Sequence, residues 1–144
     1  MTSRETIISA LFTLLQGTAG INTSSRKVKH WSEVTQREQP ALFLAQGKET
    51  LQAAKMGEPV RHTLTVMVYL YAHTQADSKT APSQILNPVV DAIEAALHPT
   101  FEGTKQTLGG LVVHAGIVGT IETDEGALGD QGVVIIPIEI VFIQ

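Results

Sequence analysis

The spacing of apolar residues over positions 83–97 predicts a helix that packs against a sheet. Ile85, Val89 and Ile93 lie four residues apart, and at about 3.6 residues per turn such positions share one face. The whole stripe consists of Ile85, Leu86, Val89, Val90, Ile93 and Leu97. Pro88 lies inside this pattern, so either Asn87 caps a helix that begins there or a longer helix is bent. The pattern favours the longer helix, because its stripe already includes Ile85.

A second amphipathic helix is predicted near the first residue of the sequence. Thr2 and Glu5 are three residues apart, a spacing typical of a capping box. The residues that follow place an apolar side chain at each turn until Gly17, where we expect the helix to end. These residues are Ile7, Ile8, Leu11, Phe12, Leu14 and Leu15.

The other apolar runs alternate or are bounded by turn residues, as β-strands are. We predict strands over 41–46, 60–72, 108–123 and 133–143, with a possible short strand over 26–31. Pro137 cannot donate a ladder hydrogen bond, so its strand is either at an edge or bulged. The fold class expected is α+β: one domain over 1–144, with a mostly antiparallel twisted sheet of about four to five strands and two helices on one face. Residues 47–59 are too long for a tight hairpin turn, so we expect a projecting loop there.

The predicted sheet has more apolar surface than two helices cover. The strand over 133–143 is apolar on both faces, and Met67 and Tyr69 lie on the face away from the helices. Exposed apolar patches of this extent mark partner surfaces. Self-association is therefore the favoured interpretation. The alternative is that loops, or Trp31 and its neighbours, cover this face within one chain.

Composition restricts the classes of function. The chain has 144 residues, 43% of them hydrophobic and 17% charged, which is typical of one globular domain. Its formal net charge of −4 argues against a general phosphate-binding surface. It contains no cysteine, hence no disulfide or thiolate ligand. No apolar run approaches the roughly 18–20 residues of a membrane span, so we expect no membrane partner.

Candidate chemistry is weak throughout the sequence. No two of the five histidines have metal-ligand spacing, and we interpret His114 as a packed or interface imidazole. The acidic residues near 122–130 lack the alternating pattern of a calcium loop. The basic residues Arg26, Lys27, Lys29 and Arg37 around Trp31 fit a solvated strand face better than a nucleic-acid site. We therefore expect no enzyme activity, no catalytic residue, no metal and no cofactor.

The order of these segments resembles the tail terminator (tail completion) proteins of long-tailed bacteriophages. The resemblance covers nearly the whole chain and is carried by three stretches: QPALF at 39–43, TLGGLVV at 107–113 and the closing strand VVIIPIEIVF. The proline within the helix and the long loop at 47–59 depart from the family pattern.

The resemblance implies a structural virion protein of α/β type that assembles as a ring, a hexamer in this family, on the head-proximal end of the tail tube. Such a ring ends tube polymerisation and provides the docking surface for the head connector. The implied partners are sister copies, the tail tube protein and the connector, and DNA passes through the channel without sequence-specific binding. The implied location is the virion tail, after assembly in the host cytoplasm.

On this interpretation we place Met67, Tyr69 and Tyr71 at the subunit contact. The charged residues of the two hairpin ends are candidates for docking to the tube or connector: Lys48, Glu49, Lys55, Asp124, Glu125 and Asp130. Two alternatives stay open. One is a neighbouring neck or head-completion protein, and the other is a small-ligand-binding α+β domain that uses His114 or the acidic loop.

Overall fold

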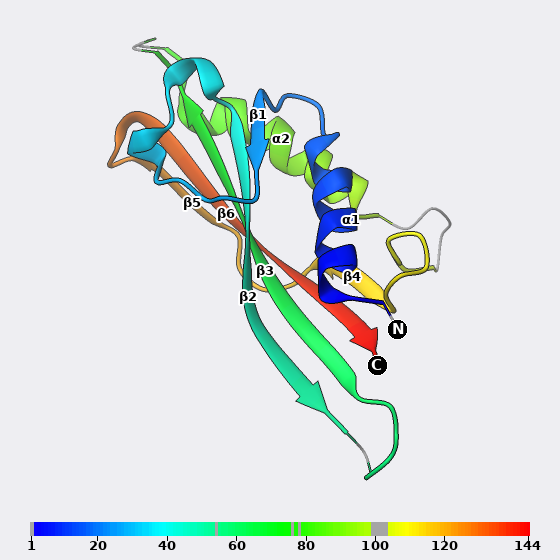
Figure 1. Cartoon of the computed structure of the whole chain (residues 1–144). Coiled ribbons are helices and arrows are strands. Elements are labelled where there is room, and N and C mark those ends of the chain that lie inside the picture. Colours follow the sequence, from blue (N-terminus) through cyan, green and yellow to red (C-terminus); the bar gives the residue numbers. More distant parts are fainter. Residues whose placement is uncertain (1, 54, 76, 78, 99–103) are drawn as a thin grey trace.

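The computed structural model describes residues 2–53, 55–75, 77, 79–98 and 104–144. It is an α+β fold in which two helices lie on one side of a long twisted sheet (Figure 1). The elements in chain order are α1 (Arg4–Gln16), β1 (Thr23–Ser25), η1 (Trp31–Glu33), η2 (Gln36–Glu38), β2 (Ala41–Gln52), β3 (Arg61–His73), α2 (Pro82–Ala96), β4 (His114–Ile117), β5 (Glu122–Gly126) and β6 (Gly129–Ile143).

Within these ranges the sheet has six strands, one more than the upper limit expected. The order is β1-β2-β3-β6-β4, and β5 pairs with β6 as well. Every pairing is antiparallel except that of β1 with β2. The predicted strand at 26–31 is wrong: the strand lies earlier, at Thr23–Ser25, and Trp31–Glu33 form a 3₁₀ turn. Thr23–Ser25 run alongside residues 41–43, a long-range pairing without a local sequence signal.

The strand predicted over 108–123 is wrong for residues 108–113, which form a turn, and the remainder is divided into β4 and β5 opposite Pro137 of β6. β4 ends at Ile117, opposite Ile138, and β5 begins at Glu122, opposite Ile135. Residues 118–121 therefore oppose only two residues of β6. Val60 exchanges backbone hydrogen bonds with Gln144, so the backbone N–H of Gln144 points towards β3. Because this direction alternates along a strand, the backbone nitrogen of Pro137, seven residues earlier, points towards β4 and β5. Its missing N–H therefore faces residues 118–121, where β6 forms no ladder pair, while on its other side β6 stays in register with β3 through Met67 and Pro137. The strand is neither at an edge nor bulged against β3; its pairing is interrupted on one side.

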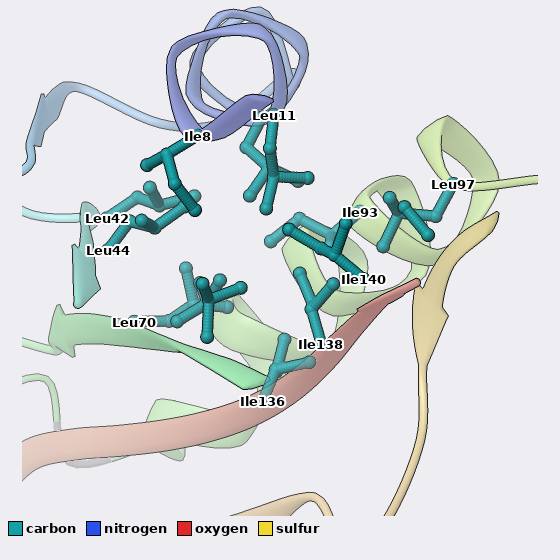
Figure 2. Packing of buried hydrophobic residues seen from close by; sticks show 14 of the residues in the cluster. Ile8, Leu11, Leu42, Leu44, Leu70, Ile93, Leu97, Ile136, Ile138 and Ile140 are labelled. Carbon is teal, nitrogen blue, oxygen red and sulfur yellow. The ribbon is translucent and has the colours of Figure 1, made fainter. Parts of the chain in front are cut away.

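Both helices pack on the same face of the sheet, as predicted. Helix α1 begins after Ser3, whose hydroxyl accepts a hydrogen bond from the Thr6 amide at 3.1 Å. The predicted Thr2–Glu5 capping box is therefore wrong, because Ser3 is itself a strong cap. Helix α2 runs unbroken through Pro88, which confirms the longer helix. Figure 2 shows Ile8, Leu11, Ile93 and Leu97 of the helical layer facing Leu42, Leu44, Leu70, Ile136, Ile138 and Ile140 of the sheet.

The loop predicted at 47–59 is shorter than expected. β2 continues to Gln52, and its register against β3 shifts between Gln46 and Glu49. Gly47 sits in this bulge, where a Cβ atom would lie 2.8 Å from the Thr65 carbonyl oxygen, so only glycine fits without a shift. The end of the β2–β3 hairpin still projects beyond the two helices (Figure 1).

Candidate assembly surface

Among the described residues, the face of the sheet opposite the helices is covered at one end, and near its centre the connection between β4 and β5 lies over the buried Pro137, where a Cβ atom on Gly119 would be 3.3 Å from the proline Cγ. Residues 31–38, which we call the covering segment, place Trp31 and Val34 over a small cluster of Ala41, Phe43 and Tyr71. The alternative that Trp31 and its neighbours cover this face is thus realised in part. Beyond the covering segment lies what we call the open face. It consists of half-buried residues of β2, β3 and β6: Ala45, Thr65, Met67, Tyr69, Ile135 and Glu139.

The strand register brings the open-face residues together in cross-strand pairs. Tyr69 lies opposite Ile135, Thr65 opposite Glu139, and Ala45 opposite Met67. Such neighbours contact each other on one face of a sheet. Two of the three residues proposed for a subunit contact, Met67 and Tyr69, are therefore adjacent on a surface that solvent reaches.

Tyr71 does not belong to the open face. It is 4% exposed, its ring lies 5.4 Å from that of Phe43, and its hydroxyl donates to the Lys29 carbonyl at 2.7 Å. Burial raises the pKa of Tyr71. Its side chain fixes the covering segment and is used within the chain. The alternating pattern of β3 could not reveal this, because Tyr69 and Tyr71 occupy equivalent positions along the strand.

The charged residues proposed for docking on the β2–β3 hairpin separate into two groups. Lys48 and Lys55 are exposed. Glu49 is held by Arg4, whose Nε and Nη2 donate at 2.7 and 2.5 Å, and lies 3.0 Å from the Nδ1 of His62. The Arg4 hydrogen bond lowers the pKa of Glu49 to about 2. Glu49 therefore joins α1 to the hairpin, while the two lysines are free to meet a partner.

The acidic residues proposed for docking lie at the other end of the sheet. Asp124 is exposed, as is Glu125, whose carboxylate accepts the Ser83 amide at 2.9 Å. The hydrogen bonds from Ser83 lower the pKa of Glu125. Asp130 is half-buried, and its carbonyl accepts from the Thr74 amide at 3.0 Å. Within the described ranges no three histidine, aspartate or glutamate side chains are grouped to hold a metal ion.

A pocket beside the open face was not foreseen. Its volume is about 430 Å³, and its lining joins the covering segment to the β5–β6 hairpin: Trp31, Glu122, Thr123, Asp124, Leu128, Val133 and Ile135. We call it the acidic pocket, because Glu122 and Asp124 are its charged residues. The sequence places Trp31 among basic residues, and only folding sets it beside these carboxylates.

The basic residues around Trp31 are dispersed by the fold. Arg26 forms an ion pair with Glu5 of α1. Arg26 and Lys27 also line a cavity of about 580 Å³ with Leu44, Ala45 and Gln46 at the edge of β2. His114 lies in β4, with its ring over Gly116. The buried Nδ1 of His114 has no hydrogen-bond partner in the described part of the chain.

Neither α1 nor α2, the two α-helices of the described ranges, is long and apolar enough to cross a membrane. No family model matches the chain, and neither does any curated protein. Among solved structures, 26 chains match. One of them belongs to the virion of a native gene transfer agent (GTA) particle. It is 8% identical to this chain with a TM-score of 0.56, and the match covers 94% of this chain and 93% of that one. At this identity the similarity is one of fold.

Proposed function

We propose that the chain is a structural virion protein that forms a ring at the head-proximal end of a tail tube. The ring ends tube polymerisation and presents the docking surface for the head connector. The observation that carries this proposal is the fold similarity to a virion chain over 94% of this chain. Both chains are covered almost completely, so the similarity extends over nearly all of both chains and not over a shared substructure alone.

The open face supplies the surface that such an assembly needs. Met67, Tyr69 and Ile135 are apolar and half-buried, and a sister copy placed on them would remove the remaining area from water. A contact between two different surfaces of the same chain closes into a ring when the rotation between copies divides a full turn. An isologous pair would stop at two copies.

A structural role also agrees with the chemistry found at the surface. Among the ionic side chains that are held closely are Glu49 and Glu125, which are bound to other elements of the same chain. They connect α1 to β2 and α2 to β5. Their hydrogen bonds stabilise the arrangement of helices on the sheet and leave the lysines of the hairpin for contacts with partners.

The experiment is negative-stain microscopy of the protein mixed with tail tubes and, separately, with portal-bound head connectors from the same virus. We expect ring-shaped density at one end of each tube. Binding to connectors without binding to tubes would instead favour the alternative, a neck or head-completion protein. Binding to neither would overturn the structural assignment.

A further inference from the structure

We propose that the tip of the β2–β3 hairpin of one copy enters the acidic pocket of the next copy, so that the ring is joined head to tail by an arm. This inference rests on the proposed function, since it names the residues through which sister copies meet. The arm tip consists of Lys55, Met56, Gly57 and Glu58.

Met56 provides the first reason. Its side chain is fully exposed, at the end of a hairpin that projects beyond both helices (Figure 1). Gly57 has a φ of +86° and the Glu58 amide donates to the Lys55 carbonyl at 3.2 Å, so the tip is a defined turn. The turn presents a flexible, polarisable side chain of the kind that fills apolar recesses and packs on aromatic rings.

The acidic pocket provides the second reason. Trp31, Leu128, Val133 and Ile135 give it an apolar lining, and about 430 Å³ is ample for one methionine and the stem of a lysine. A recess of this kind with an aromatic wall is where a protruding anchor residue contributes most to an interface. It is continuous with the open face through Ile135.

Charge provides the third reason. Besides Glu49, which Arg4 neutralises, the exposed ionic residues of the hairpin are Lys48, Lys55, Glu58 and Arg61. Their formal charges sum to +2, from three cations and one anion. The pocket carries Glu122 and Asp124, with Glu125 and Asp130 close by in sequence. Opposite potentials of this kind orient two surfaces and fix their register.

The positions of the two surfaces make the contact head to tail. Arg61, at the arm, pairs with Ile143, whereas Tyr71 pairs with Val133 of the pocket. The arm and the pocket are therefore at opposite ends of the same pair of strands. A copy that receives an arm in its pocket offers its own arm to a third copy, which is the heterologous contact that a ring requires.

The absence of cysteine from the chain permits a direct test by disulfide crosslinking. The variant Met56→Cys/Leu128→Cys is oxidised both free in solution and bound to tail tubes, and its products are separated without reductant. We expect a ladder of covalent multimers that ends at the ring size. The matched control Met56→Cys/Thr13→Cys, with its second cysteine at an exposed position of α1 on the helix side of the sheet, is expected to stay monomeric.

A charge exchange tests the same contact without cysteines. Lys55→Glu and Asp124→Lys are each expected to weaken association about tenfold, and the double variant to restore it. Glu94→Lys, an exposed reversal on α2, is the control and should assemble normally. Failure of the double variant to recover would overturn the inference.

The outcomes separate this inference from the proposed function. Tubes that are capped by protein without a crosslinked ladder leave the function standing and overturn the arm contact. A ladder without capped tubes supports the arm contact and overturns the function. Products that stop at a dimer contradict the head-to-tail arrangement.

Discussion

Gln39 and Gln131, which are 92 residues apart, join their side-chain amides by two hydrogen bonds. Gln39 Nε2 donates to Gln131 Oε1 at 3.1 Å, and Gln131 Nε2 donates back to Gln39 Oε1 at 2.9 Å. Gln39 Nε2 also donates to the carbonyl of Val34, and Gln131 Nε2 to that of Ala72. Because both side chains are buried, this pair fixes the covering segment to the end of β3 and β6.

We expect Gln131→Leu to loosen the covering segment and lower the free energy of unfolding by about 1–3 kcal/mol. The substitution leaves the buried Oε1 of Gln39 without its donor, and an unpaired buried polar atom carries a cost of that size. Trp31 is the single tryptophan of the chain, so its fluorescence reports on the covering segment directly. Gln36→Leu, at an exposed position of the same segment, should change neither quantity. A normal Trp31 emission in Gln131→Leu would show that the pair does not hold the segment.

Gly132→Ala is expected to destabilise the protein by about 1–3 kcal/mol, the cost of overpacking a core. A Cβ atom at Gly132 would lie 2.4 Å from Cβ of Pro82 and 3.2 Å from Cδ1 of Leu86, which would force α2 away from β6. Chemical denaturation measures the loss. Gly17→Ala is the control, because its nearest contacts are ordinary ones at 3.7 Å. Equal stability of both variants would mean that α2 does not pack as closely as described.

The lowered pKa of Glu49 predicts how the free energy of unfolding depends on pH. Its pKa is lowered from 4.5 to about 2 in the folded chain, chiefly by the Arg4 hydrogen bond. A lowered folded pKa stabilises the protein above the unfolded pKa, and this contribution is lost as the pH falls from about 4.5 to about 2. At about 1.4 kcal/mol per pKa unit, the lowering from 4.5 to about 2 corresponds to a contribution of at most about 4 kcal/mol.

Chemical denaturation at a series of pH values between 6 and 2 measures this contribution in the parent and in Glu49→Gln. The variant should be less stable at pH 6 and should lose less stability on acidification. For Glu58→Gln, at an exposed position of the same hairpin, the free energy of unfolding should change with pH as it does in the parent. Parallel curves for Glu49→Gln and the parent would contradict the role given to Glu49.

Met67→Glu tests whether the open face is a subunit contact, with little expected effect on the fold of one copy. A carboxylate at this half-buried position can still reach solvent in one copy, but a sister copy would bury it without a partner, at high cost. We expect an unchanged circular dichroism spectrum together with loss of rings in sedimentation. Thr13→Glu, at an exposed position of α1 on the helix side of the sheet, should form rings as the parent does. Normal ring formation by Met67→Glu would exclude Met67 from the subunit contact.

The features that were predictable from the sequence are those with a local period. The stripe of α2 and the alternation of β3 follow from side-chain geometry within one element, and both are observed. The missing N–H of Pro137 also predicts an interruption of the hydrogen bonds between strands. Which edge it disturbs depends on the register of β3 against β6, however, and register is a long-range property.

The covering segment and the acidic pocket could not be predicted, because both depend on residues far apart in sequence. Tyr71 is removed from the surface by the Lys29 carbonyl, 42 residues away. Trp31 and Asp124 line one pocket because the Gln39–Gln131 pair and the Tyr71 hydrogen bond hold the segment of Trp31 on the sheet. From the sequence, Glu49 is predicted to be an exposed charge in a loop. Its ion pair depends on α1, which places Arg4 beside it.

The length of growing tail tubes tests the central claim most directly. Tube protein from the same virus is polymerised with increasing amounts of this chain, and tube lengths are measured by microscopy. If the chain is a terminating ring, growth should stop once there is about one ring per tube end, and Met67→Glu should leave growth unaffected. Tubes that lengthen equally with and without the parent protein would contradict the account.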